Sequence, residues 1–168
     1  MMRIINIHKR LVYQPKENIT QILDSLTSVN DRLWPNEQWP PMIFKHGLAE
    51  GAAGGHGPIK YSITKYIPGQ LIAFTFIKPA AFSGIHKFEV TEVEKGQTEI
   101  KHTIDMSVSL TGIIIWYTAI KWLHDALLED CLDKVENNFL SQKKKTEWNS
   151  WVRFLRKVFR RKKQQQLK

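Results

Sequence analysis

Four consecutive stretches of alternating apolar and polar residues constrain the fold of this chain more than any other feature. They cover residues 58–67, 71–78, 84–93 and 98–109. Successive side chains of a β-strand point to opposite faces, so this alternation indicates strands with one buried face. The links between the stretches are short, and short links force neighbouring strands to run antiparallel. We therefore predict one curved antiparallel sheet.

Two of these strands place a histidine on the apolar face. His86 alternates in phase with Phe88 and Val90, and His102 alternates in phase with Ile104. Polar groups on an otherwise apolar inner face favour a cavity that orients a ligand. The alternative is that both are structural histidines, bonded to the backbone or to a tyrosine such as Tyr61 or Tyr66.

The remaining segments predict an α+β chain. Residues 3–14 form an expected strand, 16–29 a short helix, and 113–140 a long helix with apolar residues at helical spacing. In the first strand the pattern favours Ile5, Ile7, Leu11 and Tyr13 as the inner face, over the more polar set Ile4, Asn6, His8, Arg10 and Val12. The glycine-rich residues 49–58 predict a hairpin turn or a cavity lid, because no Gly-Lys-Ser/Thr follows them as in a phosphate-binding loop.

This order of elements resembles the START-like, or SRPBCC, superfamily, which includes polyketide cyclase-like and birch-pollen-allergen-like proteins. The resemblance rests on residues 57–61, 66–74, 84–90 and 98–104 and on the helix that follows Gly112. It covers roughly residues 3–140. The chain departs from the family at the proline-broken segment 30–41, where many members have a second helix.

The resemblance implies a helix-grip fold, in which a bent antiparallel sheet wraps around a long C-terminal helix. It also implies a cavity between the two that binds a hydrophobic small molecule or a lipid. The alternative is an ordinary filled core. The residues expected to line the cavity are Tyr61, Ile63, Phe74, Phe76, His86, Phe88, Val90, His102, Ile104, Met106, Trp116, Ile120 and Leu123.

An enzyme of cyclase, dehydratase or hydrolase type is the second hypothesis for the same cavity. Imidazole titrates near neutral pH and can act as a general base, but the predicted inner faces offer few acids as partners. The family has no universal catalytic motif, and no Gly-x-Ser-x-Gly motif is present. Cys131 lies on the apolar stripe of the long helix and is expected in the core. The catalytic residues, if any exist, are unknown.

We predict no metal and no cofactor. Two histidines can provide two zinc ligands, but a catalytic zinc site usually needs a third protein ligand. His46, His56 and His124 show no paired spacing such as His-Glu-x-x-His.

The positive charge of the chain is concentrated at its C-terminal end. Residues 143–168 carry eleven Lys or Arg against the single acid Glu147, whereas residues 1–142 carry fourteen Lys or Arg and fifteen Asp or Glu. We therefore divide the chain into a ligand-binding domain, 1–142, and a basic tail, 143–168. Attraction to anions is expected of the tail alone.

The tail has the pattern of a basic amphipathic helix, which favours an anionic membrane surface. The residues expected at that surface, or at another anion, are Trp148, Trp151, Arg153, Arg156, Lys157, Arg160 and Arg161. The alternatives are that the apolar stripe packs on the protein's own body or on a second copy, or that the cations bind a nucleic acid or an acidic protein. The ordered apolar stripe makes nucleic acid the less favoured partner, and the oligomeric state stays open.

The expected location is cytoplasmic, at most peripheral to a membrane. Charged residues interrupt any early apolar run, so no signal peptide is predicted, and one cysteine excludes an internal disulfide. The most apolar window, residues 110–128, contains Lys121, His124 and Asp125, and a charge near the centre of a spanning helix costs roughly 2.5–3.5 kcal/mol. This window is therefore predicted to be a buried helix.

Overall fold

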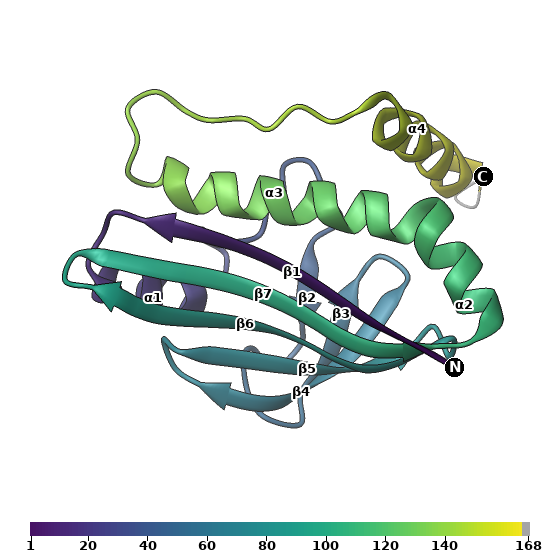
Figure 1. The fold of residues 1–168 in the computed structure, drawn as a ribbon, viewed down its shortest axis with the longest axis horizontal. Helices are drawn as coiled ribbons and strands as arrows, with labels where there is room; N and C mark the ends of the chain where they lie inside the picture. The colour runs from purple at the N-terminus through teal and green to yellow at the C-terminus, as the bar shows by residue number, and fades with distance from the viewer. Residues whose placement is uncertain (166–168) are drawn as a thin grey trace.

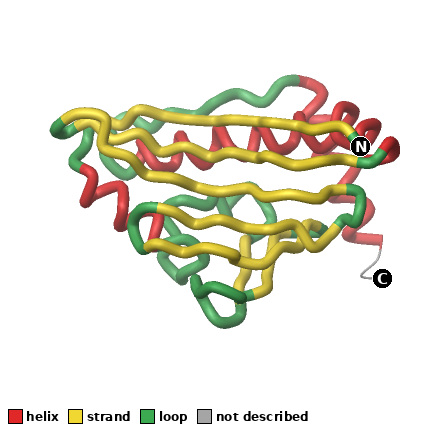
Figure 2. The backbone as a smooth tube through the Cα atoms, turned by 60° about the horizontal axis from the view of Figure 1, so that its bottom comes forward, coloured by secondary structure: helices red, strands yellow, loops and turns green. Residues whose placement is uncertain are grey.

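A computed structural model describes the backbone of residues 1–165 and the side chains of residues 1–159. The chain forms one seven-stranded antiparallel sheet with the strand order β1-β7-β6-β5-β4-β3-β2. The strands are β1 (Met2–Val12), β2 (Met42–Phe44), β3 (Ala53–His56), β4 (Ile59–Ile67), β5 (Leu71–Lys78), β6 (Phe82–Glu94) and β7 (Gln97–Val108). Figure 2 shows the curvature of this sheet. The predicted sheet and the α+β class are confirmed.

The helices lie mainly after the sheet in the chain. They are α1 (Lys16–Asp24), α2 (Leu110–Ile115), the π-helical turn η1 (Trp116–Ile120), α3 (Lys121–Asn137) and α4 (Ser150–Gln165). The segments α2, η1 and α3 follow one another without a break and form one bent helix that lies along the sheet (Figure 1). The sheet wrapped around this helix is the predicted helix-grip fold.

The start of this long helix is fixed by two local features. The side chain of Ser109 accepts a hydrogen bond from the backbone N–H of Gly112, which caps the first turn. Gly112 is needed because a Cβ there would lie 2.9 Å from the carbonyl oxygen of Ala81. The helix therefore begins directly after β7 and runs back over the sheet.

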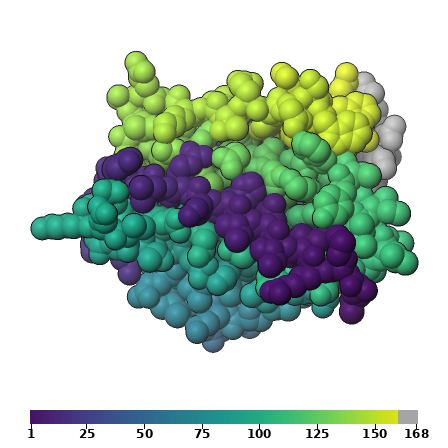
Figure 3. Space-filling model, viewed as in Figure 1, coloured from purple at the N-terminus to yellow at the C-terminus, as the bar shows by residue number. Residues whose placement is uncertain are grey.

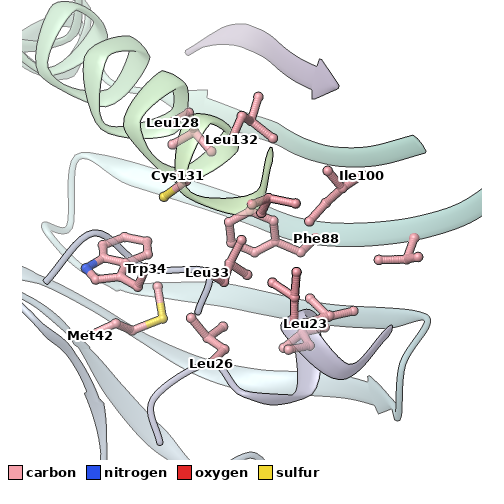
Figure 4. Close-up of a cluster of buried hydrophobic side chains, with 14 of the residues drawn as sticks. Leu23, Leu26, Leu33, Trp34, Met42, Phe88, Ile100, Leu128, Cys131 and Leu132 are labelled. Atoms are coloured by element: carbon pink, nitrogen blue, oxygen red, sulfur yellow. The ribbon is translucent and has the colours of Figure 1, made fainter. Parts of the chain in front are cut away.

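The interior consists of two apolar clusters. The larger one joins α1, the segment 31–44, the sheet and α3, and part of it is shown in Figure 4. It contains Phe88 and Ile100, together with Leu128, Cys131 and Leu132 of α3. The smaller cluster, at the η1 end of the sheet, contains Ile4, Phe82, Ile104, Met106, Val108 and Trp116. Along β7, His102 separates Ile100 of the first cluster from Ile104 of the second, so the predicted histidines lie where the clusters meet.

The predicted register of the first strand is wrong. Ile5 and Ile7 are 55% and 54% exposed, whereas Ile4 and Val12 of the other face are buried. The inner face of β1 carries Asn6, His8 and Arg10 because α3 presents carboxylates to it. Their partners on α3 are Asp125, Glu129, Asp133 and Glu136.

The glycine-rich segment is not only a loop. Its second half forms β3, which pairs with β2 on one side and β4 on the other. Gly55 has a φ of 146°, and a Cβ there would lie 2.1 Å from the carbonyl oxygen of Ile59. The glycines thus allow two backbones to approach closely, which residue propensities alone do not predict.

Within the residues that the structure describes, no helix is both long enough and apolar enough to span a bilayer.

Candidate functional site

His86 and His102 meet in the interior, on neighbouring strands. In the β6–β7 register His86 lies opposite Ile104, and Phe88 lies opposite His102, so the two imidazoles are diagonal neighbours on one face. Nδ1 of His86 lies 3.3 Å from Nε2 of His102, and both residues are buried. The predicted pairing of the two histidines on one inner face is therefore present in the structure.

Each ring keeps one nitrogen without a partner. Nε2 of His86 and Nδ1 of His102 are buried and have no hydrogen-bond partner among the described residues. A neutral imidazole carries one N–H and one acceptor nitrogen. Whichever ring donates within the pair, one of the two remaining nitrogens is therefore a donor and the other an acceptor.

Burial keeps both rings neutral at pH 7. It lowers the pKa of His86 and of His102 well below the ordinary value, and the neighbouring histidines lower it further. The pair accordingly offers hydrogen bonds without charge. This chemistry suits a neutral hydroxyl or carbonyl group better than an ion.

Aromatic rings surround the pair. Phe74 stacks on His86 with the ring centroids 4.6 Å apart, Tyr61 meets His86 edge-on at 4.6 Å, and Phe88 meets His102 at 4.6 Å. Tyr61, Phe74 and Phe88 are fully buried, so no water-sized space borders them. A ligand at the pair must therefore displace some of these side chains.

The other predicted lining residues differ in exposure. Ile63, Val90, Ile104, Met106 and Trp116 are buried. Phe76, Ile120 and Leu123 are partly exposed, and Phe76 and Ile120 pack against the smaller cluster near η1. Part of the predicted lining is thus partly exposed beside the π-helical turn. Such turns occur frequently at functional sites.

Two further histidines extend the site, and the sequence-based prediction missed both. Nδ1 of His56 lies 2.9 Å from the Tyr61 hydroxyl, and burial lowers the pKa of His56 to about 3. The ring of His124 lies 5.2 Å from that of His102, and its Nδ1 also lacks a partner in the described part of the chain. Helical spacing from Ile120 and Leu127 was the signal that could have placed His124 on the inner side.

A polar cluster closes the site between β1 and α3. His8 contacts Asp125 through Nε2 at 3.1 Å and Glu129 through Nδ1 at 2.9 Å. Burial lowers the pKa of His8, but the two carboxylates outweigh it and raise the pKa overall. His124 Nδ1 lies 3.8 Å from the same Asp125 carboxylate. A histidine beside an acid therefore does lie at one end of the interior.

The same cluster is where a metal ion would fit by distance. The ligand atoms of His8, His124 and Asp125 all lie within 4.8 Å of one another. Asp125 also receives a hydrogen bond from Lys121, and His8 is shared with Glu129, so ion pairs already occupy these groups. The expectation of no metal stays a prediction.

The tail packs partly on the body of the protein. Val152 and Leu155 are buried, and the Arg156 guanidinium lies over the rings of Trp39 and Trp148, at 4.1 and 4.3 Å from their centroids. The indole of Trp148 donates a hydrogen bond to Asp130. Two residues expected at a membrane, Trp148 and Arg156, thus face the protein itself.

Three other predicted contact residues keep exposed side chains, although the indole of Trp151 donates a hydrogen bond to the Thr118 carbonyl. Trp151, Arg153 and Lys157 are exposed. The side chains of Arg160 and Arg161 lie outside the described residues. Figure 3 shows the yellow tail as a ridge alongside the green helix α3.

A groove of about 220 Å³ lies at the surface beside α3 and the start of the tail. Charged and amide side chains line it, among them Asp130, Asp133, Lys134 and Asn137. This lining is unsuited to an apolar ligand, so the histidine pair remains the candidate site.

Comparison with solved structures identifies the architecture. Norcoclaurine synthase from Thalictrum flavum, in complex with dopamine and hydroxybenzaldehyde, matches with a TM-score of 0.62 at 14% identity, over 84% of this chain and 90% of that chain. A protein from Thermobifida fusca matches with a TM-score of 0.61 at 11% identity, over 85% and 99%. A conserved protein of unknown function from Enterococcus faecalis matches with a TM-score of 0.57 at 13% identity, over 95% and 86%.

The chain has the same helix-grip fold as these structures. This likeness extends over the sheet and the long helix, as the sequence predicted. No family model matches the sequence. No curated protein matches it either. In this helix-grip protein the histidine pair lies between the sheet and the long helix.

Proposed function

We propose that this protein binds a hydrophobic small molecule or lipid between the sheet and the long helix. The observation that carries the proposal is the pair of buried imidazole nitrogens without partners, Nε2 of His86 and Nδ1 of His102. Leaving a buried polar atom unpaired costs about 1–3 kcal/mol, so a ligand that supplies the missing partners gains that energy. The fold supports the proposal, because the synthase with the same architecture holds two aromatic molecules.

The pair also indicates the chemistry of the ligand. One free donor and one free acceptor, both neutral, suit a hydroxyl group, which can accept and donate at once. A carboxylate is disfavoured because its charge would be buried without a cation. The aromatic residues around the pair suit an apolar or aromatic remainder.

Access for the ligand is expected beside η1. Phe76, Ile120 and Leu123 are partly exposed there, and the π-helical turn interrupts the regular hydrogen bonding of the long helix. Opening at this end would move Phe76 and Ile120, which pack against the smaller cluster, before the side chains around the pair are displaced.

The test compares ligands of one chain length and different head groups. Purified protein is titrated with 1-dodecanol and with dodecanoate, and binding is followed by intrinsic tryptophan fluorescence, while native mass spectrometry detects molecules retained during purification. We expect saturable binding of the alcohol, and a loss of about tenfold or more in affinity for it in His86→Leu/His102→Leu, since each lost hydrogen bond is worth about 1 kcal/mol or more.

The matched control is His46→Leu, because His46 is exposed and lies outside the site. It should bind 1-dodecanol like the unaltered protein. If the unaltered protein shows no saturable binding of a long-chain alcohol or a sterol, the proposal fails.

A second candidate function is proton-transfer catalysis in the same interior. The observation that favours it is Asp125, whose carboxylate contacts His8 and approaches His124 while the His124 ring lies beside His102. An acid that orients an imidazole is the usual arrangement of a general base. If His124→Gln removed turnover of a candidate substrate while binding persisted, catalysis would become the preferred reading.

We also propose that the basic tail contacts an anionic membrane surface. Trp151, Arg153 and Lys157 support this, since they remain exposed after the tail has packed on the body. Each Lys or Arg of the tail that lies near an anionic surface contributes about 1 kcal/mol to the free energy of binding.

A further inference from the structure

The outer side of the long helix carries a row of exposed apolar residues that the packing of the domain does not use. Leu110 is 82% exposed, Ile114 65% and Tyr117 51%. Their spacing of four and three residues places them on one side of α2 and the start of η1. The indole of Trp122, itself 40% exposed, donates a hydrogen bond to the Tyr117 carbonyl at the end of this row.

The tail helix adds to this row. The indole of Trp151 donates a hydrogen bond to the carbonyl of Thr118, so α4 lies directly against η1. Phe154 stacks on Trp151 at 5.3 Å, and both remain about half exposed, at 53% and 44%. We call the combined surface of Leu110, Ile114, Tyr117, Trp122, Trp151 and Phe154 the docking face.

The charge around the docking face has one sign. The segments that form it, residues 110–122 and 150–165, contain eight Lys or Arg and no Asp or Glu. Arg153 and Lys157 of α4 are exposed. An apolar and aromatic surface beside exposed cations matches the interface of a bilayer with anionic head groups.

We propose that the docking face inserts into the surface of an anionic lipid bilayer, with α2 and η1 contributing alongside the tail. This inference deepens the proposed membrane contact of the tail and does not depend on ligand binding. Aliphatic side chains and tryptophan enter the head-group region, where they lose contact with water, while Arg153 and Lys157 attract the anionic lipids.

Two other binding partners, a second copy of the chain and a nucleic acid, fit the docking face less well than a bilayer does. A second copy of the chain would bring the exposed Arg153 and Lys157 of both copies together at the interface. A nucleic acid would satisfy the cations and could stack on Trp151, but Leu110 and Ile114 would gain little from it. A bilayer uses both the charge and the aliphatic residues.

The experiment is flotation of the full chain with vesicles of phosphatidylcholine alone and of phosphatidylcholine with phosphatidylserine. We expect binding to the anionic vesicles that weakens as salt is added. Leu110→Gln/Ile114→Gln should lower the partition coefficient by about tenfold or more, because this double variant removes two inserted aliphatic side chains. Arg153→Gln/Lys157→Gln should lower it by about fivefold per cation.

The matched control is Ile5→Gln/Ile43→Gln, which alters two isoleucines that are 55% and 58% exposed on the sheet, away from the docking face. It should bind vesicles like the unaltered protein. Circular dichroism verifies that all variants are folded.

The outcomes separate the hypotheses. If Leu110→Gln/Ile114→Gln binds as well as the unaltered protein while Arg153→Gln/Lys157→Gln does not, only the tail contacts the membrane and the inference about α2 and η1 is wrong. If no vesicle is bound, both membrane proposals fail, and the ligand proposal is unaffected. A dimer in light scattering that Leu110→Gln/Ile114→Gln converts to a monomer would overturn the inference in favour of a second copy. Preferential binding of a single-stranded RNA that competes with vesicles would overturn it in favour of nucleic acid.

Discussion

At the scale of the residue, the histidine pair places polar atoms between two apolar clusters. His86 and His102 bond to each other, so each ring satisfies one nitrogen and leaves one without a partner in the described residues. Replacing one ring leaves the other with two unpaired nitrogens, whereas replacing both removes every polar atom of the pair. The two substitutions should therefore be strongly coupled.

The coupling can be measured as a free energy of unfolding. His86→Leu and His102→Leu should each destabilise the protein, by about 1 kcal/mol, because each breaks the hydrogen bond of the pair and still leaves two buried nitrogens unpaired. The double variant should be more stable than the sum of the two single effects predicts, by about 1–3 kcal/mol. The measurement is urea unfolding of the unaltered protein, the two single variants and the double variant, which together form a double-mutant cycle. It is made at pH 7.5, about one unit above the ordinary histidine pKa. Additive effects would show that the two rings do not depend on each other.

The sequence predicted this pair and its aromatic neighbours, but not the two further histidines beside it. Alternation along single strands was sufficient to place His86 and His102 on one face, because period and register are local properties. His56 and His124 lie on β3 and on the long helix, and both reach the site only through tertiary packing. The filling of the interior by Phe74 and its neighbours is likewise a property of volume, which a pattern of apolar residues does not determine.

At the scale of the element, β1 shows how a neighbouring helix can override hydrophobic pattern. Counting apolar residues favours Ile5 and Ile7 as the inner face, yet those residues are exposed. The inner face is polar because α3, which covers β1, carries carboxylates at helical spacing on the side toward the strand. Complementary charges on the two elements thus determine the register, and this can be recognised only once the helix is known to cross that strand.

Arg10 holds this pair of elements together. It donates hydrogen bonds to Glu129, Asp133 and Glu136, and its own side chain is 23% exposed. Arg10→Leu leaves three carboxylates near one another with no shared cation, so we expect a loss of about 2–4 kcal/mol in the free energy of unfolding. Ile7→Thr, on the exposed face of the same strand, should change it by less than about 0.5 kcal/mol. Equal effects of the two substitutions, measured by thermal and urea unfolding, would show that the ion pairs do not fix the strand.

At the scale of the whole molecule, the interior and the docking face meet at η1. The π-helical turn itself contains both the buried Trp116 and the exposed Tyr117. Ile120, which is partly exposed and packs against the smaller cluster as Phe76 does, ends the same turn. If the docking face inserts into a bilayer, a hydrophobic ligand could pass between the lipid and the site without crossing water. Ligand binding and membrane insertion do not depend on each other, but this arrangement makes the two proposals compatible.

The interior histidines also make the stability of the whole molecule depend on pH. Burial lowers the pKa of His56, His86, His102 and His124. Below the unfolded value of about 6.5 the unfolded chain binds these protons and the folded protein does not, so stability falls as the pH falls. The pKa of His8 is raised, and its contribution has the opposite sign: it is present at low pH and is lost as the pH rises through its folded value.

Four lowered pKa values outweigh the one that is raised, so acid should destabilise the protein. We expect the free energy of unfolding to decrease from about pH 6.5 downward, by up to about 1.4 kcal/mol per pH unit for each neutral histidine. Urea unfolding at successive pH values measures this slope. In His86→Leu/His102→Leu the slope should be shallower because two of the responsible groups are gone. A slope in the double variant equal to that of the unaltered protein would mean that the two buried rings take up protons in the folded state, and the neutral hydrogen-bonding pair on which the ligand proposal rests would then be wrong.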